Sequence, residues 1–381
     1  MLLKLFGSAC SDGKGRPVFL FRAHLDSQDP PALKDSDSDN SGQVLLVMDL
    51  MRLHSNAVSS DVAGLMAAQL QTNLTVVTEF FLLGFQGSQH FRNGLFLLFL
   101  VVFVATICGN LLIITLVSTS KNLHTPMYFF ISQLSVSDIL VTSNIVPNML
   151  HILLNNGRTI TFVNCITQWY FICASETFEC FLLTVMSYDR YVAICNPLRY
   201  TSVMTISFSS KLSAMCWLLG IFVSFIVTVT PSELNFCGPN IIDHLFCDLV
   251  PILELSCSDP FIVHLEVYIM GTPIVIIPTT IIVMSYTNIV TTVLRIPSTT
   301  GRQKAFSTCS SHLIVVSMYY WTMFSVYILP TKVLTLSMSK ILSLLYTVFT
   351  PFINPIIYSL RNKDIKKAVQ ETFHKHIINV N

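Results

Sequence analysis

The stretch Met-Ser-Tyr-Asp-Arg-Tyr-Val-Ala-Ile-Cys-Asn-Pro, residues 186–197, closes one of seven long apolar runs in this chain. An arginine inside a bilayer is costly unless it lies near the interface or has a partner, and the adjacent Asp189 offers Arg190 such a partner. The apolar residues before Asp189-Arg190-Tyr191 therefore predict a membrane-spanning helix that ends at the membrane surface on this triplet.

The composition of the whole chain supports a membrane protein. Only 11% of the 381 residues are charged and 52% are apolar, whereas a typical soluble domain carries about 25% charged residues. The net charge of +1 gives no electrostatic basis for binding nucleic acid. The lipid bilayer is thus the expected partner of most of the chain.

The apolar runs are long enough to cross a membrane. A hydrocarbon core about 30 Å thick takes roughly 20 apolar residues in a helix. We expect an all-α membrane protein, a seven-transmembrane helix bundle followed by a short amphipathic C-terminal helix. The expected spans are residues 94–117, 127–150, 165–190, 212–229, 263–294, 305–329 and 341–360.

Basic residues at the span ends predict the orientation, because loops rich in Lys and Arg stay in the cytoplasm. The N-terminus is then extracellular and the C-terminus cytoplasmic, and the expected site is the plasma membrane. Asn73 in Asn73-Leu74-Thr75 agrees as an N-glycosylation acceptor, which is usable only outside. The predicted cytoplasmic ends carry Lys121, Arg190, Arg199, Lys211, Arg295, Arg302, Lys304, Arg361, Lys363, Lys366, Lys367 and Lys375, against Arg92, Arg158, Lys332 and Lys340 at the other ends.

The ends of the chain differ in composition from the spans. Residues 1–65 contain an Asp/Ser/Pro-rich stretch, residues 26–42, and have no helical or strand periodicity, so they predict a disordered extension. We expect translation to start at Met66, the alternative being a genuine extracellular or regulatory tail. Residues 66–93 then form the extracellular N-terminus, 94–360 the seven-helix domain and 361–381 a cytoplasmic tail. Apolar residues in that tail recur at helical spacing and predict an amphipathic helix on the inner leaflet, namely Ile365, Ala368, Val369 and Phe373.

Four cysteines face the oxidising side in this orientation. Cys165 starts the third span, and Cys237, Cys247 and Cys257 lie in the loop after the fourth. Four cysteines allow three pairings. Unpaired loop thiols are the alternative, although they would be reactive there.

Several motifs, in order and spacing, closely resemble the olfactory receptor family of rhodopsin-like G-protein-coupled receptors over residues 78–374. Two departures are Ser187, where the family usually has Ala, and Trp321, where Gly is common and whose bulk we expect near the pocket. The motifs are Gly109-Asn110, Pro126-Met127-Tyr128-Phe129-Phe130, Leu134-Ser135, Asp138, residues 186–197, Ser285-Tyr286, residues 304–312 (KAFSTCSSH) and residues 351–362 (PFINPIIYSLRN).

The resemblance implies an odorant receptor and not an enzyme. A small, volatile ligand would bind in the outer half of the bundle, activate a stimulatory heterotrimeric G protein and raise cyclic AMP. No cofactor is implied. The resemblance also pairs Cys165 with Cys247 and Cys237 with Cys257.

By resemblance, Asp189-Arg190-Tyr191 forms the switch for G-protein coupling. Arg190 is held in the inactive state and released in the active one, which Tyr286 and Tyr358 help to hold. A simple interfacial anchor is the alternative, because Arg and Tyr are favoured at that depth anyway. Asn354-Pro355 predicts a hinge in the last span, since proline cannot donate a helical hydrogen bond.

Two acids lie near the predicted midplane. Glu179 precedes Arg190 by eleven residues, or about 16 Å of helix, and Asp138 is equally deep in the second span. Buried acids near each other do not both ionise without a shared cation or proton. We interpret Asp138 and Glu179, with Asn110, as a sodium or proton site; neutral acids hydrogen-bonded to polar neighbours are the alternative.

The pocket prediction combines helical spacing with the resemblance. Without the resemblance, these side chains would be read as ordinary helix packing. An ionised Glu176 would favour an amine, whereas a protonated one would donate to an alcohol or carbonyl. The predicted ligand-binding residues are Cys173, Glu176, Thr177, Met270, Ile274, Tyr320, Met323, Phe324 and Tyr327, with Cys180 on the same stripe.

Two other classes of function compete with an odorant receptor. Intramembrane acids and a proline-broken helix also suit an ion-coupled transporter, although we find no inverted repeat. A rhodopsin-like receptor for an internal metabolite, outside olfaction, would have the same sequence features. A membrane enzyme is disfavoured, because metal-ligand pairs, nucleophile elbows and phosphate loops are absent from the sequence.

Overall fold

The computed structural model describes residues 77–236, 239–327 and 336–380. Residues 73–381 form one compact unit. The predicted disordered extension 1–65, the start at Met66 and the glycosylation acceptor Asn73 lie outside the described residues.

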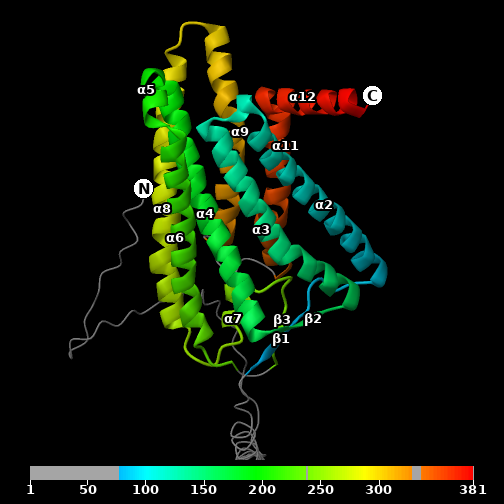
Figure 1. Cartoon of the computed structure of the whole chain (residues 1–381). Coiled ribbons are helices and arrows are strands. Elements are labelled where there is room, and N and C mark those ends of the chain that lie inside the picture. The colour runs from blue at the N-terminus through cyan, green and yellow to red at the C-terminus, as the bar shows by residue number, and fades with distance from the viewer. Residues whose placement is uncertain (1–76, 237–238, 328–335, 381) are drawn as a thin grey trace, which may run out of the picture. The chain divides into compact units, whose positions relative to one another are not determined.

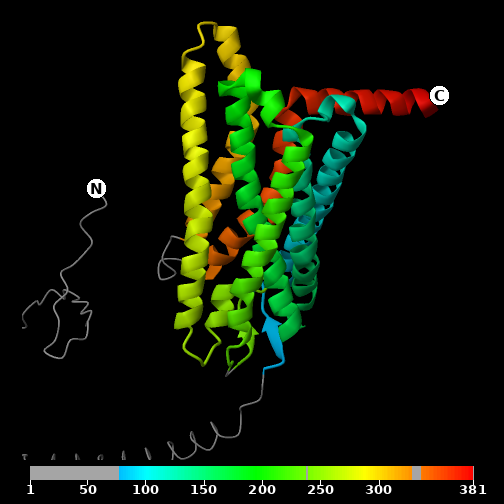
Figure 2. The same cartoon turned by 60° about the vertical axis from the view of Figure 1, so that its left-hand side comes forward.

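Long helices packed side by side make up the unit and confirm the predicted seven-helix bundle (Figures 1 and 2). The last of them combines two α-helices and a π-helical turn between them. Beyond it, α12 (Lys363–Val380) runs across the end of the bundle (Figure 1). The bundle helices are α2 (Gln89–Thr119), α3 (Pro126–Asn155), α4 (Phe162–Cys195), α6 (Ile206–Ser232), α8 (Phe261–Leu294), α9 (Thr299–Tyr327) and the series α10 (Leu336–Leu344), η2 (Leu345–Phe349) and α11 (Thr350–Arg361).

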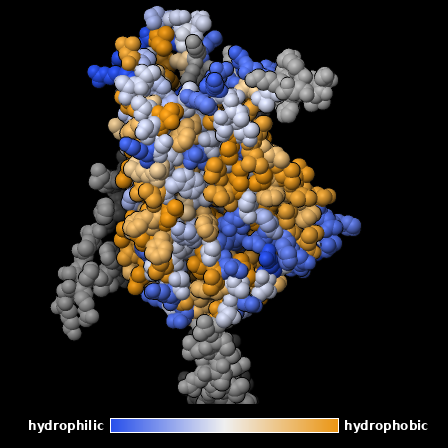
Figure 3. Space-filling view, viewed as in Figure 1, coloured by the Kyte–Doolittle hydropathy of each residue, from blue (hydrophilic) through white to orange (hydrophobic). Residues whose placement is uncertain are grey.

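Six helical segments among the described residues are long and apolar enough to cross a membrane. The remaining long helix, α9, begins with polar and basic residues, Thr299, Thr300, Arg302 and Gln303. Apolar side chains gather on the flanks of the bundle, with hydrophilic ones toward its ends (Figure 3). The chain is therefore a multi-pass membrane protein.

The helices extend beyond the predicted spans because capping side chains, rather than hydropathy, set where they begin. Ser88 Oγ accepts from the Phe91 amide at 3.3 Å at the start of α2, and Thr161 caps α4 in the same way. Such caps satisfy amides that have no partner within the helix. Helices α2 and α4 are therefore longer than the apolar spans that we predicted from the sequence.

The irregular part of the last span lies one turn earlier than we predicted. The expected hinge at Asn354-Pro355 is inside α11, which continues through Pro355. The backbone instead widens in η2, where Thr350 Oγ1 donates to the Leu345 carbonyl at 2.9 Å. Pro351 follows this turn directly, and its ring crowds the preceding turn and removes a donor.

Helix α4 lies at the centre of the bundle and contacts α3, α6, α8 and α9. Gly220 of α6 allows a close approach, since a Cβ there would lie 2.6 Å from the Ala174 carbonyl oxygen. Beside it the Trp217 ring stacks on Phe178, with centroids 3.8 Å apart. The central helix thus brings its side chains against four neighbouring helices.

A small sheet at the other end of the bundle from α12 was not predicted. Strand β1 (Glu79–Leu82) lies between β2 (Arg158–Thr161), antiparallel, and β3 (Ile241–Ile242), parallel. Phe80 and Leu82 are buried, following the alternation of a strand. Short helices complete the loops, η1 (Lys121–Leu123), α5 (Pro197–Val203) and α7 (Leu249–Leu253).

Candidate functional site: a ligand pocket coupled to a cytoplasmic switch

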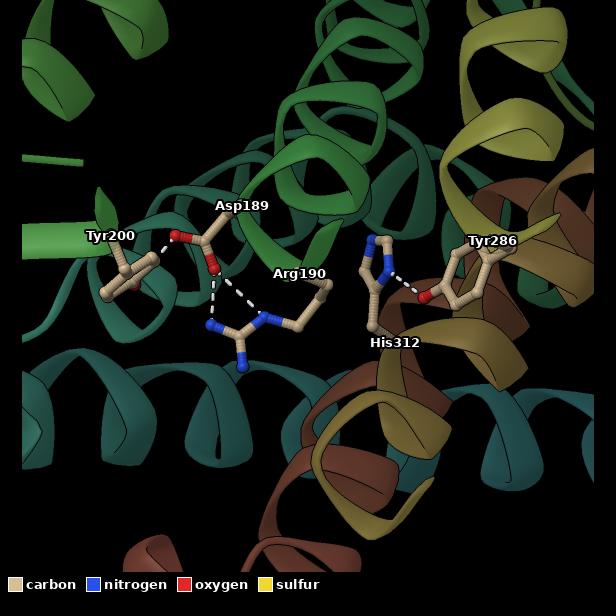
Figure 4. A network of polar contacts seen from close by, with 5 residues as sticks. All are labelled: Asp189, Arg190, Tyr200, Tyr286 and His312. Atoms are coloured by element: carbon tan, nitrogen blue, oxygen red, sulfur yellow. Dashed lines mark hydrogen bonds and ion pairs between the residues drawn. The ribbon is translucent and has the colours of Figure 1, made fainter. Parts of the chain in front are cut away.

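At the Lys/Arg-rich end of the bundle, Arg190 is held by its neighbour. Its Nε donates to Asp189 Oδ2 at 2.9 Å, and Nη2 makes a second contact with the same oxygen. Tyr200 of α5 donates to Asp189 Oδ1 at 2.9 Å. Figure 4 shows that the three side chains form one chain of contacts. Asp189 is thereby occupied on both oxygens, and Arg190 is engaged within the receptor.

A second pair lies across from this network. The Tyr286 hydroxyl and His312 Nδ1 are 2.6 Å apart, joining α8 to α9 (Figure 4). The Tyr358 hydroxyl of α11 is buried with no hydrogen-bond partner. Neither tyrosine contacts Arg190 by a hydrogen bond, and the hydrogen bonds of the Arg190 side chain go to Asp189.

Buried polar groups connect α2, α3 and α11 in the middle of the bundle. Asn354 Nδ2 lies 3.1 and 3.2 Å from the two carboxylate oxygens of Asp138. One turn away, Asn110 Nδ2 donates to the Pro351 carbonyl at 3.2 Å. Pro351 follows the π-helical turn η2, and its carbonyl is the acceptor that α11 presents to α2. The three helices are coupled through these amides.

The second midplane acid is held through the same helix α3. Ser137, next to Asp138, donates to Glu179 Oε1 at 3.0 Å. Both carboxyl groups are buried, and the oxygen donors around them are of the kind that a hard cation prefers. Asn110 Oδ1, also buried, has no partner. The residues therefore fit either a small cation or a shared proton.

The predicted ligand stripes meet where α4, α8 and α9 face one another. Cys180 Sγ lies 3.1 Å from the Tyr320 hydroxyl and 3.2 Å from the Ile274 carbonyl. Tyr319 donates to the Glu176 carbonyl at 2.7 Å. Met323 and Thr177 are buried, and Cys173, Glu176, Met270, Ile274 and Tyr320 are partly buried.

Two aromatic side chains of α9 do not join this meeting point. Trp321 is 62% exposed and Phe324 55%, on the flank away from buried Tyr319 and Met323. Our expectation that Trp321 adds bulk near the pocket is wrong. Phe324, which we expected to line the pocket, lies on the surface of the bundle. The face of α9 that is buried carries Tyr319 and Met323. The spacing of i and i+4 shows which residues share a face, but it does not show which face turns toward the neighbouring helices. The side chain of Tyr327 lies outside the described residues.

The outer loop is fastened over this end of the bundle. Cys165 and Cys247 are joined in a disulfide, and the Cys247 amide donates to Gln168 Oε1 at 3.0 Å. Cys257 is also disulfide-bonded, and its predicted partner Cys237 lies outside the described residues. The pairing with Cys247 agrees with the resemblance.

Charged residues add a second fastening that the sequence did not reveal. Lys340 Nζ contacts Asp243 Oδ1 at 2.5 Å and donates to the Gly84 carbonyl at 3.0 Å. His244 is buried beside this pair, and burial lowers its pKa below the usual 6.5. Its Nδ1 faces the Phe246 carbonyl at 3.1 Å. The loop is thus tied to the N-terminal segment and to α10.

Sequence reasoning also missed Tyr200 as part of the switch. Burial, and then the charge of Asp189, raise the pKa of its phenol. The signal was Asn196-Pro197, which ends α4 and starts α5, because proline is favoured at the first helical position. That turn returns the chain to Asp189 within eleven residues.

Comparison with known proteins identifies the family. A family model described as "Olfactory receptor" matches residues 99–376. The chain belongs to the olfactory receptor family. Olfactory receptor 11L1 of Homo sapiens is 45% identical over 80% of this chain and 94% of its own length, and olfactory receptor 10A7 of Homo sapiens is 44% identical over 80% and 97%.

The fold agrees with this family. The crystal structure of squid rhodopsin superposes with a TM-score of 0.60, at 18% identity, covering 76% of this chain and 82% of that one. At this identity the match shows the fold alone. Because members of the olfactory receptor family are signalling receptors, the chain is a membrane receptor and not an enzyme.

Proposed function

We propose that this olfactory receptor binds a small, volatile molecule between α4, α8 and α9, activates a stimulatory heterotrimeric G protein and raises cyclic AMP. Its orientation is N-terminus outside, in the plasma membrane. The observation that carries the proposal is the closed set of contacts Arg190–Asp189–Tyr200. Beside it, Tyr286 is paired with His312 rather than with Arg190, and the Tyr358 hydroxyl has no hydrogen-bond partner. A receptor must hold its switch in one form for a ligand to have an equilibrium to shift.

The ligand acts by preferring the open form. Cys180, Tyr320 and Ile274 join three helices through weak contacts of 3.1 to 3.2 Å. A ligand that separates or bridges these groups changes how α9 lies against α4. Because α9 also carries His312, the partner of Tyr286, such a movement reaches the switch. A ligand that contacts both forms equally would shift nothing.

The acid pair gives this movement a second control. A sodium ion or a proton held by Asp138 and Glu179 would be bound by Ser137 and Asn110 oxygens as well, and would neutralise the buried charge. Asn354 connects Asp138 to α11, one turn before Tyr358. The occupied site holds α3, α4 and α11 in the closed arrangement, so sodium should lower basal signalling.

The direct test is Arg190→Ala in cells that carry a cyclic AMP reporter. We expect the ligand response to disappear while surface expression persists, because the residue that meets the G protein is gone. Arg199→Ala, an exposed basic residue at the same end, is the matched control and should respond normally. A normal response from Arg190→Ala would refute the assignment of the switch.

Glu176 decides the ligand class. Its position on α4 between Cys173 and Cys180 places a carboxyl group at pocket depth. If it is ionised, amines are favoured, and Glu176→Gln should abolish amine responses while it spares alcohols and ketones. If it is protonated, Glu176→Gln keeps a donor and all responses survive. A panel of amines, acids, alcohols, ketones and aromatics in the same reporter assay separates the two.

A further inference from the structure

An apolar groove opens between α2, α11 and α12, away from both the ligand pocket and the switch. It has a volume of about 160 Å³ and is lined by side chains that include Leu112 and Leu116 of α2, Ile356 of α11, and Ile365 and Val369 of α12. An apolar cavity of about 150 Å³ is large enough to bind benzene. The groove can therefore take several carbons of a hydrocarbon chain.

The groove is formed by a close approach deeper in the membrane. A Cβ at Gly109 would lie 3.2 Å from Pro355 Cγ, so α2 and α11 touch there through backbone and proline ring. Toward the Lys/Arg-rich end, α12 crosses the ends of both helices (Figure 1). The three helices thus leave a corner between them that their own side chains do not fill.

The surroundings of the groove exclude water as its occupant. Leu112 is 42% exposed and Ile356 37%, on helices that cross the membrane. The hydroxyl of Ser359, the polar side chain in the lining, donates to the Ile356 carbonyl of its own helix. A water molecule needs two or more polar partners, and Ser359 supplies the one polar side chain among the lining residues. A lipid chain is the natural occupant.

Charge at the mouth of the groove selects among lipids. At 100° per residue, Lys366 lies on the flank of α12 next to Val369, whereas Asp364 lies on the other flank. Asp364 is held there by the Tyr128 hydroxyl at 2.8 Å. Lys121, five residues after the lining residue Leu116, begins η1, which follows α2 and packs on α12. Both lysines are exposed. The mouth is cationic and attracts an anionic headgroup.

We propose that this groove binds one anionic phospholipid of the cytoplasmic leaflet, with an acyl chain in the corner and its headgroup on Lys121 and Lys366. The acyl chain gains little binding free energy when it moves from the bilayer into the groove, since the surrounding lipid tails are equally apolar. Selectivity therefore comes from the lysines, about fivefold for each at the membrane surface. Since α12 contains no cysteine that could carry a covalently attached acyl group, we assign the acyl chain to a separate lipid molecule.

A second copy of the receptor is a poorer occupant. Symmetric contact places the same patch of each copy against the other. Lys121 and Lys366 of one copy would then approach those of the next, and like charges repel. The lipid brings the opposite charge, whereas a second copy repeats the same one.

The test is native mass spectrometry of the full-length receptor released from bilayers of phosphatidylcholine with a minority of phosphatidylserine. We expect phosphatidylserine to be retained over phosphatidylcholine by about 25-fold, the product of two fivefold preferences. Ala105→Trp, which fills the groove from its lining, should abolish retention. Val104→Trp is the matched control, because Val104 is 52% exposed outside the lining, and should retain lipid normally.

A second pair of variants guards against misfolding by the tryptophan. Lys121→Gln with Lys366→Gln alters exposed side chains only and should remove the preference for phosphatidylserine. Lys367→Gln, on the far face of α12 and paired with Glu371 at 3.8 Å, should leave the preference intact. Retention by Ala105→Trp, equal retention of both phospholipids, retention of sterol alone, or a dimer that Ala105→Trp abolishes would each overturn the proposal.

Discussion

The two ends of this receptor are held by different kinds of contact. At the end that carries the sheet, which our proposed orientation makes the outer end, a disulfide, a three-stranded sheet and the Lys340–Asp243 pair fix the loops. At the opposite end, the proposed inner end, Arg190, Tyr200 and Tyr286 are held by side-chain hydrogen bonds. A disulfide and paired strands are harder to break than single side-chain hydrogen bonds. Under the proposed function, the first end would support the pocket and the second end would switch.

Among the changes that test this difference between the two ends, removing the disulfide should have the largest effect on stability. The bond closes a segment with a sequence separation of 82, and loss of such a link costs on the order of 4 kcal/mol. We expect Cys247→Ser to lower the thermal stability and surface level of the receptor sharply. Cys108→Ser, an exposed free thiol, is the control. Equal stability of the two variants would show that the outer end is not held covalently.

Loosening the inner end should change signalling more than stability. Tyr200→Phe removes a hydrogen bond to a charged acceptor, worth about 1.5 kcal/mol, or roughly tenfold in the equilibrium between closed and open forms. Basal cyclic AMP should rise and the melting temperature should change little. Tyr188→Phe is the matched control, since Tyr188 lies next to Asp189 on α4 and is 39% exposed. If basal signalling stays low in Tyr200→Phe, Asp189 needs no help in holding Arg190.

Acid should weaken the outer end by the smallest amount, because a single group is involved. Burial lowers the pKa of His244 below 6.5, with Asp248, Lys340 and Asp243 as its charged neighbours. The unfolded chain then binds the proton more readily, so stability is complete above pH 6.5 and falls as the pH drops below it. Thermal unfolding across that range should show the loss.

His244→Phe should flatten this pH dependence, since no proton can then bind at residue 244. His90→Phe, a change at an exposed histidine on α2, should keep it. An unchanged pH profile in His244→Phe would assign the acid sensitivity to other groups.

The pocket stands between these ends, and its residues were predicted unevenly. Cys180, Tyr320 and Ile274 could be placed from helical spacing and family resemblance, and the structure brings them together. Trp321 and Phe324 could not, because α9 turns its other flank inward. Residue spacing fixes which side chains share a face, but only the neighbouring helices decide which face is buried.

The sequence by itself determined the seven helices, the family and the residues of the switch motif. These depend on local properties: apolar runs long enough to span a bilayer, and Asp189 next to Arg190 where one of them ends. Only the tertiary structure decided the outer sheet, the contacts of Tyr200 and Lys340, the widened turn before Pro351 and the groove beside α12. Each of these joins residues distant along the chain or depends on how closely two backbones approach, and no local pattern encodes such distances.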